Sequence, residues 1–456
     1  MHYYKSRSPT NDLKVLKKHS DIHSKSRLRV LLLAYSISPI RGSEYSVGWN
    51  HVNYMSKFCD FTVLYGLAGP HMGDVEDIET HLQKNGELPN VRFINIRPSY
   101  LARLLNWPNR NNFFVYSFYL AYKVWHRQAA RKAQFLLDNE QFDLIHYLCP
   151  IGYREPGYLW QLDIPYVWGP VGGMVPVKIL KGGRESFVSK CKIHLKNFTN
   201  SIQLRMSHRV ARAFICTDKL IAATSENSEI LKKQFKLDVQ VIPENAIPNY
   251  WKMAKNKKVE TKASSPVKLI WIGSLDARKS PRLLIDALIQ ISESDWHLDL
   301  VGDGKLRNKV RSMLIAAGLS DKITLHGFIL RSEVQKLMTK ADLHIVTSMS
   351  EGNPTVIWEA MSSGVPTLSL AHCGMRDTLC EACSVLIDIS NYKETRNSIA
   401  SKIDHLIHDP KLLASKKAGA LSCAKHHLWS NRNKTWINIY YEVIENYKRN
   451  KFRSRS

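Results

Sequence analysis

Short aliphatic runs that alternate with longer amphipathic stretches constrain the fold of this chain more than any other feature. Such alternation is typical of βα units, whose strands form parallel sheets. The runs fall into two series, which are 29–35, 60–66, 91–96, 143–148, 164–169, 219–224 and 239–244, and then 267–273, 296–302, 322–327, 341–347, 365–370 and 384–388. The sequence therefore predicts an α/β protein with two doubly wound, Rossmann-like domains.

The boundary between the two series is a polar, lysine-rich segment at 251–266, which ends in Ser-Ser-Pro and has the composition of a linker. With 456 residues the chain has room for two full domains. We expect a basic, flexible extension at 1–28, a first domain at 29–250 and a second domain at 267–427. The remaining segment, 428–456, is expected to form a helix that returns to the first domain and ends in a basic tail.

The formal charge of +25 indicates acidic partners, such as nucleic acid, an anionic membrane surface or phosphorylated substrates. The segment 97–137 is basic without acidic residues, and it includes an aromatic stretch from Phe113 to Trp125 whose apolar run is too short to cross a bilayer. This aromatic, basic stretch could bind a membrane, together with the basic segment from Met174 to Arg212, which we interpret as a loop. Alternatively, most of its rings pack on the first sheet and the cations form a solvated face.

The cysteines and the N-terminus bear on the compartment. No apolar signal-peptide core is found in 1–29, and eight scattered cysteines favour reduced thiols in the cytoplasm, with the protein free or peripheral on the inner face of the membrane. Cys380 and Cys383 form a C-x-x-C pair, but no second such pair follows. We therefore expect ordinary buried thiols, no metal site and no cofactor.

Glycines follow several of the expected strands. Gly42 is expected to form a tight, ligand-binding turn before a helix that starts near Tyr45. Gly302 and Gly304 could begin a dinucleotide fingerprint, but Arg307 stands where its third glycine would be. A nicotinamide-binding or P-loop site is therefore not expected.

The stretch SEGNPTVIWEAMSSGVP, at 350–366, follows a strand and should open a helix. Asn353 is suited to cap that helix and Pro354 to its first position, which leaves Glu351 in the loop and Glu359 about one and a half turns into the helix. The amides of Gly352 and Asn353 could then bind an anion, helped by the helix dipole. A phosphate-bearing ligand would fit between the two carboxylates, each of which accepts hydrogen bonds from sugar hydroxyls.

This stretch resembles the E-x7-E motif of the family 4 retaining glycosyltransferases, which have the GT-B fold of two facing Rossmann-like domains. Further segments resemble that family in the same order, from about 29 to 447. They include DLIHYLCPIGYREPGYLWQLDIPYVWGPVGG, IAATSENSEIL, LIWIGSLDARKSPRLLIDAL, LVGDGKLRNKV and CGMRD. The resemblance implies that the first domain binds the acceptor and the second a nucleotide sugar.

Roles for single residues follow from this resemblance. Glu359 is expected to bind the ribose, Glu351 to lie near the transferred sugar, and Lys279 to pair with the donor diphosphate in place of a metal, assisted by Arg278. Other positions are expected to contact the donor (Gly42, Gly352, Asn353, Pro354, Thr355) or to lie on the acceptor side (Glu44, Arg154). For Glu359 and Lys279 the ordinary alternatives are a solvated helix residue and a surface lysine.

Two departures from the family pattern affect these expectations. Ser274 stands where the family usually has an arginine, so either Arg278 takes over the phosphate or the geometry of the bound donor differs. His146 is expected to be catalytic, although Leu148 replaces the second histidine of the usual pair.

The function that this resemblance implies is transfer of a sugar from a nucleotide diphosphate sugar to a glycan or lipid-linked glycan in cell-surface polysaccharide synthesis. Two other classes stay open, a basic nucleic-acid-binding protein and an inactive sugar-binding protein with the same fold. Against the first, the chain carries no RNP, KH, zinc-finger or helix-turn-helix signature, so nucleic acid is not expected as a partner.

Overall fold

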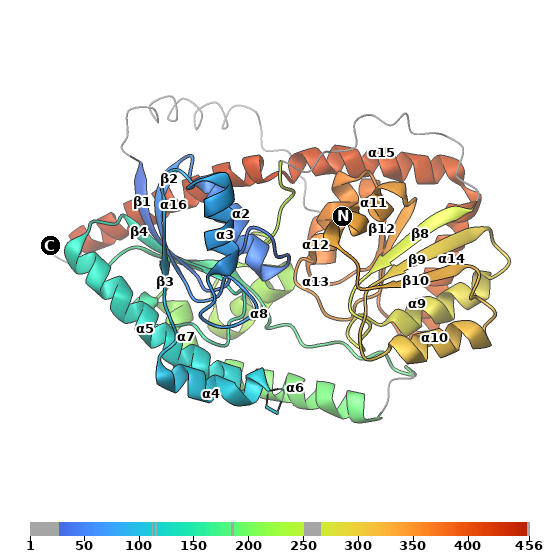
Figure 1. Ribbon diagram of the computed structural model, residues 1–456, viewed down its shortest axis with the longest axis horizontal. Coiled ribbons are helices and arrows are strands. Elements are labelled where there is room, and N and C mark those ends of the chain that lie inside the picture. Colours follow the sequence, from blue (N-terminus) through green and yellow to red (C-terminus); the bar gives the residue numbers. More distant parts are fainter. Residues whose placement is uncertain (1–26, 112, 115, 184–186, 250–265, 454–456) are drawn as a thin grey trace.

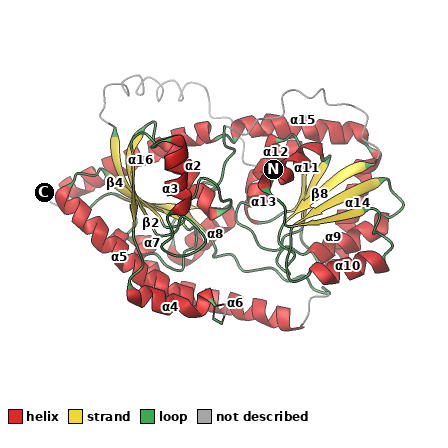
Figure 2. Cartoon of the chain, viewed as in Figure 1, coloured by secondary structure: helices red, strands yellow, loops and turns green. Residues whose placement is uncertain are grey.

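The computed structural model describes residues 27–111, 113–114, 116–183, 187–249 and 266–453 (Figure 1). The expected extension at 1–28 and the expected linker at 251–266 lie outside these ranges, except for residues 27, 28 and 266. Two domains lie side by side, each a parallel sheet covered by helices on both faces (Figures 1 and 2).

The first sheet is entirely parallel and has the order β3-β2-β1-β4-β5-β6-β7. Its strands are β1 (Leu28–Ala34), β2 (Cys59–Tyr65), β3 (Val91–Asn95), β4 (Leu144–Cys149), β5 (Tyr166–Val171), β6 (Lys219–Ala222) and β7 (Gln240–Val241). The connecting helices are α2 (Glu44–Met55), α3 (Glu76–Asn85), α4 (Tyr100–Arg110), α5 (Ser117–Asn139), α6 (Phe187–Met206), α7 (His208–Ile215) and α8 (Ser225–Phe235).

The second sheet repeats the scheme in the order β10-β9-β8-β11-β12-β13. Its strands are β8 (Val267–Ile272), β9 (Trp296–Val301), β10 (Ile323–Gly327), β11 (Leu343–Val346), β12 (Thr367–Leu370) and β13 (Ser384–Ile387). The helices are α9 (Pro281–Leu288), α10 (Arg307–Ala316), α11 (Arg331–Lys340), α12 (Thr355–Ser362), α13 (Cys373–Thr378), α14 (Tyr392–His408), α15 (Pro410–His426) and α16 (Trp429–Arg453). Two doubly wound domains, and hence the predicted α/β class, are confirmed.

The last helix, α16, leaves the second domain and packs on the first (Figure 1). Trp436 and Tyr440 join the core formed by β1, β2, β4 and α2. The Tyr440 hydroxyl lies 2.9 Å from His51 Nε2 and 2.7 Å from His146 Nδ1. The C-terminal end of the chain therefore completes the interior of the first domain.

A second connection runs from β5 into α6. Leu180, in the segment after β5, is buried in the core of the second domain, and the Tyr392 amide donates to the carbonyl of Lys181 at 2.9 Å. The basic segment from Met174 to Arg212 was interpreted as a loop, but from Phe187 onward it forms α6 and then most of α7.

Candidate active site

The two domains meet at the carboxyl ends of their strands, where parallel sheets bind ligands. From the first domain come Glu44, at the start of α2, Ile151, just after β4, and Glu244, just after β7. From the second domain comes the turn between β11 and α12. A Cβ added to Gly352 of that turn would lie 2.8 Å from Glu244 Oε1 and 3.4 Å from Ile151. A side chain at this point would therefore have to displace the Glu244 carboxylate.

A pair of cations at the exit of β8 meets a carboxylate at the exit of β11. Arg278 NH1 lies 2.8 Å and Lys279 Nζ 2.6 Å from Glu351 Oε1. The side chains of Lys279 and Glu351 are only 13% and 9% exposed. The structure thus brings together three of the predicted site residues, and because two cations share one carboxylate, the cluster keeps an excess of positive charge.

Hydrogen bonds to the exit of β11 hold this cation pair in place. The Met349 amide donates to the Arg278 carbonyl at 2.8 Å, and the Thr347 hydroxyl donates to the Lys279 carbonyl at 2.9 Å. Ser274 donates to Asp276 Oδ2 at 2.6 Å, and the Lys279 amide donates to Asp276 Oδ1 at 3.0 Å. Ser274 therefore orders the loop that presents the cations.

The glycines after β9 serve the same loop. A Cβ added to Gly302 would lie 1.9 Å from the Gly273 carbonyl oxygen, and one added to Gly304 would lie 2.6 Å from that of Leu275. Both glycines also have positive φ angles, 130° and 159°. These close contacts, rather than a dinucleotide, account for the G-x-G sequence.

The start of α12 differs from the expectation. The helix begins at Thr355, with Pro354 as its N-cap, and the Asn353 side chain makes no cap. Asn353 Nδ2 instead donates across the domain boundary to the Ala223 carbonyl at 3.0 Å and to Glu244 Oε2 at 2.5 Å. Its backbone amide donates to Glu244 Oε1 at 2.9 Å, so this amide is not exposed to an anion as predicted.

Glu359 lies on α12 and forms an ion pair with Arg331, whose NH2 is 2.8 Å from Glu359 Oε1. Arg331 starts α11 and also approaches the first domain, since a Cβ on Gly42 would be 4.0 Å from its NH1. Gly42 itself does not have a positive φ angle; the residue that does is Ser43, at 56°, and α2 begins directly after it. The tight turn is therefore present but does not rest on Gly42.

The acceptor-side residues lie at the same boundary. Burial, together with the neighbouring Glu244, raises the pKa of the Glu44 carboxyl to about 7. Arg154 donates to the Tyr119 hydroxyl at 3.1 Å and to Asn200 of α6. The pKa of Lys196, on α6, is lowered by burial and by the positive charges of Arg154 and Arg278. Cations from both domains therefore face one another here.

His146 does not lie in this cleft, which corrects the expectation of a catalytic histidine. It is fully buried in β4, with Nδ1 at Tyr440 and Nε2 2.8 Å from the Gly169 carbonyl. Burial lowers its pKa to about 4. Both ring nitrogens are engaged and the ring is neutral, so His146 secures α16 to the sheet.

Sequence reasoning missed Arg331, Glu244 and Lys196. Each reaches the site from an element remote in sequence from its partner. No sequence pattern distinguishes these residues. Arg331 is a single arginine at the start of a helix, Glu244 is a single glutamate after a short strand, and Lys196 is one of several lysines on α6.

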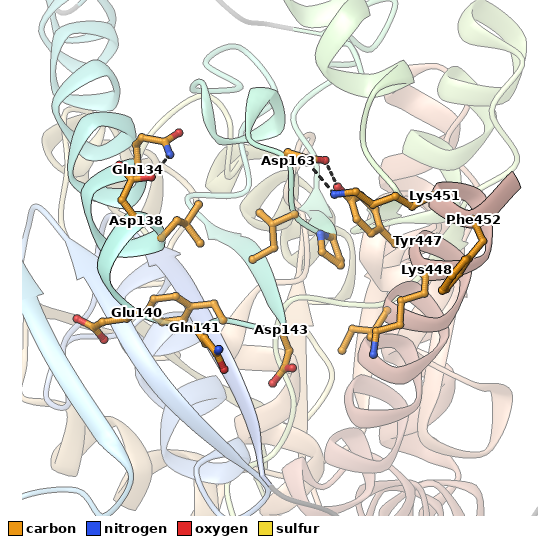
Figure 3. A pocket seen from close by; sticks show the side chains of 15 residues that line it. Gln134, Asp138, Glu140, Gln141, Asp143, Asp163, Tyr447, Lys448, Lys451 and Phe452 are labelled. Atoms are coloured by element: carbon orange, nitrogen blue, oxygen red, sulfur yellow. Dashed lines mark hydrogen bonds and ion pairs between the residues drawn. The ribbon is translucent and has the colours of Figure 1, made fainter. Parts of the chain in front are cut away.

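A hollow of about 680 Å³ lies elsewhere, where β4 and β5 begin and α16 ends (Figure 3). The carboxylates that line it are Asp138, Glu140, Asp143 and Asp163. Asp163 accepts hydrogen bonds from Tyr447 and from Lys451, the latter at 2.8 Å. The hollow is at the amino ends of the strands, opposite the cleft, so it is not part of the candidate site.

Comparison with known proteins shows which families and structures this chain resembles. The sequence model of "Glycosyl transferases group 1" matches residues 252–420, a range that contains Lys279, Glu351 and Glu359. The lipopolysaccharide glucosyltransferase WaaG of Escherichia coli K12 is 27% identical over 202 residues, 42% of this chain and 52% of that protein. An Escherichia coli UDP-Gal:alpha-D-GlcNAc-diphosphoundecaprenol alpha-1,3-galactosyltransferase is 26% identical over 215 residues, 43% of this chain and 53% of that protein. The chain thus spans about half the length of the curated relatives it matches.

Solved structures extend the likeness to both domains. Sucrose-phosphate synthase of Thermosynechococcus elongatus superposes with a TM-score of 0.61 at 15% identity, covering 92% of this chain and 100% of that one. HepE of Anabaena, solved with UDP and glucose, superposes with a TM-score of 0.58 at 16% identity, covering 91% and 100%. At these identities the likeness shows the fold. The second domain therefore matches the model of the group 1 glycosyl transferases, and the chain as a whole has the GT-B fold.

Proposed function

We propose that this protein is a retaining glycosyltransferase that moves a sugar from a nucleotide diphosphate sugar to a glycan or lipid-linked glycan in cell-surface polysaccharide synthesis. The observation that carries the proposal is the Arg278–Lys279–Glu351 cluster at the strand ends of a group 1 glycosyl transferase domain. The names of the relatives, which include a lipopolysaccharide glucosyltransferase and a diphosphoundecaprenol-dependent galactosyltransferase, support the substrate class.

The charges fit the electrostatics of such a transfer. The bond from C1 of the sugar to the diphosphate breaks, a bond from the acceptor oxygen to C1 forms, and the acceptor proton leaves with the diphosphate. The leaving group gains negative charge as it departs, and fixed cations stabilise this state more than the bound donor. Lys279 and Arg278 supply these cations. Glu351, held between them, faces the transferred sugar, and Glu359 binds the ribose once Arg331 releases it.

The acceptor approaches from the first domain. Glu44, whose pKa is raised to about 7, can accept or donate a hydrogen bond to an acceptor hydroxyl near neutral pH. Arg154 and Lys196 provide positive charge on that side, which suits an acceptor carrying phosphate.

A panel of nucleotide sugars tests the transfer. The purified full chain is incubated with UDP-, GDP-, ADP- and dTDP-sugars, and release of the nucleoside diphosphate is measured, with Glu351→Gln as the inactive control. We expect one nucleotide to be released well above this control. Tight binding of one donor without any release would instead favour a sugar-binding protein. Retention on DNA or RNA at moderate salt would favour a nucleic-acid-binding protein.

The stereochemistry is tested separately. With the active donor and a simple alcohol or glycan acceptor, proton NMR of the first-formed product gives its anomeric configuration. Retention is expected from the family resemblance. A product of inverted configuration would refute the retaining mechanism and leave the transferase assignment intact.

We also propose that the protein binds an anionic membrane surface, where a lipid-linked acceptor would reside. The surface is formed by α6 and α4, which lie along the same side of the molecule (Figures 1 and 2). In the described ranges no helix has both the length and the apolar character to cross a membrane. Binding would therefore be peripheral.

An exposed apolar stripe on α6 supports this surface. Its members are separated by seven, three, four and four residues and are Val188, Leu195, Phe198, Ile202 and Met206. Lys190, Lys192 and Arg205 lie on the same helix. A helix with an apolar stripe bordered by cations is suited to lie in the headgroup layer, with its apolar side chains inserted and its cations near lipid phosphates.

Helix α4 and the turn after it continue the surface. The exposed side chains there are Tyr100, Leu101, Leu104, Trp107, Phe113, Phe114 and Tyr116. Further along the aromatic stretch, Tyr122 and Trp125 are buried in the core of the first domain. The stretch from Phe113 to Trp125 is thus divided, so that only its first rings can reach a membrane.

A further inference from the structure

Three cysteines outside the cleft form a cluster that the sequence pattern did not indicate. Cys380 directly precedes a single 3-10 turn, Glu381–Cys383, which ends at Cys383, and Cys423 lies on α15. Their sulfur atoms all lie within 4.8 Å of one another. Cys380 Sγ is 3.6 Å from Cys383 Sγ and 2.8 Å from Cys423 Sγ. The fold thus adds a third thiol to the C-x-x-C pair.

The backbone around the cluster is arranged to bring these thiols together. A Cβ added to Gly419 would lie 2.0 Å from the Ala382 carbonyl oxygen, so α15 can approach the turn this closely only with glycine there. Cys423 is four residues further along α15 and therefore lies on the same face. The Cys383 amide donates to the Cys380 carbonyl at 3.1 Å, which closes the turn between the two cysteines.

We propose that Cys380, Cys383 and Cys423 bind a zinc ion, with a water molecule or an exogenous ligand in the fourth position. Zinc takes thiolates at about 2.3 Å in tetrahedral geometry, which places the sulfurs about 3.8 Å apart. The pair at 3.6 Å already has this spacing. The pair at 2.8 Å has to widen by about 1 Å, which the exposed Cys380 and the partly exposed Cys423 allow.

The chemistry of the ligands selects the metal class. Three thiolates are soft ligands that favour zinc over magnesium, calcium or manganese, which prefer oxygen. Among the described residues, no further histidine, cysteine or carboxylate joins the set. Cys380 is exposed, so the open position faces solvent.

The ion would have a structural role, independent of the proposed sugar transfer. It would join α15 to the turn after α13, the short helix that packs behind the site. At the other end of α13, the Gly374 amide donates to the Gly352 carbonyl at 3.0 Å. The zinc would thus fix the far end of an element that supports the turn carrying Glu351.

Cobalt binding tests the proposal on the full chain, purified with a non-thiol reductant and freed of metal. Co²⁺ is added stepwise while the thiolate-to-cobalt charge-transfer band in the near ultraviolet is recorded, and Zn²⁺ is then added as competitor. We expect one equivalent of Co²⁺ to give the band, Zn²⁺ to abolish it, and Zn²⁺ to raise the Tm. Because thiols must lose protons to bind, the apparent affinity should fall as the pH is lowered.

Matched cysteine variants assign the band. Cys423→Ser and Cys380→Ser should each lose it, while Cys191→Ser and Cys216→Ser, at exposed thiols elsewhere, should keep it. Circular dichroism shows whether each variant is folded, and the exposed position of Cys380 makes its variant the safer of the two. Any of three results would overturn the proposal. The wild-type chain could show no band, or the band could survive in both Cys423→Ser and Cys380→Ser. The isolated protein could also hold a Cys380–Cys423 disulfide and take up no metal.

Discussion

Replacing two apolar side chains of the α6 stripe should release the protein from anionic vesicles. Leu195 and Phe198 are 63% and 62% exposed, so about six-tenths of each side chain is in contact with water in the free protein. Full burial of a leucine or phenylalanine side chain is worth about 1.5–3 kcal/mol, so inserting this exposed part contributes about 1–2 kcal/mol for each. The double variant Leu195→Ser/Phe198→Ser should therefore bind the vesicles at least about 30-fold more weakly than the wild type.

The assay is sedimentation with vesicles at low and high salt, with the fraction bound measured against lipid concentration. Phosphatidylglycerol vesicles supply the anionic surface and phosphatidylcholine vesicles the neutral one. The wild-type chain should prefer the anionic vesicles and lose that preference at high salt, because each lysine or arginine near the surface contributes about 1 kcal/mol and is screened. Donor hydrolysis by the variant should be unchanged, which shows that it is folded.

A control variant separates this surface from general hydrophobicity. Phe135 and Ile315 are 57% and 65% exposed but lie on α5 and α10. Phe135→Ser/Ile315→Ser should bind vesicles as the wild type does. If the α6 variant binds as tightly as the wild type, or if the control loses as much, α6 does not contact the membrane.

Three further predictions concern single residues. Lys279→Met should weaken binding of the nucleoside diphosphate by about 10- to 150-fold, because one charged hydrogen bond is lost. Calorimetry should show that the variant binds the matching nucleoside, which has no phosphate, as the wild type does. An equal loss of affinity for both ligands would contradict a phosphate contact. Glu359→Gln should raise the donor KM with little change in kcat, because a ribose contact is present before and during transfer, and an unchanged KM would assign Glu359 to pairing with Arg331 alone. The pKa of His146 is lowered to about 4, so the unfolded chain binds the proton more readily, and the free energy of unfolding should fall by about 1.6 kcal/mol between pH 6.5 and 5. Urea unfolding of His146→Gln should show a smaller loss, and an equal loss would place the effect elsewhere.

The architecture could be predicted because each strand carries its own signal. The thirteen aliphatic runs match β1 to β13 within a few residues, and the order of motifs indicated that strand exits would meet. For this reason Lys279 and Glu351, more than seventy residues apart, were expected at one place and are found 2.6 Å apart. Their chemical roles remain predictions.

The errors have a common physical origin, because each depends on a partner distant in sequence. The family resemblance placed His146 near the reacting sugar, and the sequence of β4 does not reveal that α16 will cover that histidine. A local rule makes Asn353 a good helix cap, but a buried carboxylate from the first domain, Glu244, accepts hydrogen bonds from it instead. The composition of the C-x-x-C pair gave no hint of Cys423, which a helix forty residues later supplies.

The return of α16 to the first domain sets the order in which the newly synthesised chain can become folded. The last strand of the first sheet ends at Val241, but Trp436 and Tyr440 still have to fill the core over β1 and β4. At about 5–20 residues per second, the ribosome needs roughly 10–40 seconds to add those intervening residues. During that interval the apolar face that α16 will cover, with His51 and His146 on it, is open to water. A chain that terminates early is therefore left with an exposed patch in its first domain, the kind of surface that chaperones and proteases recognise.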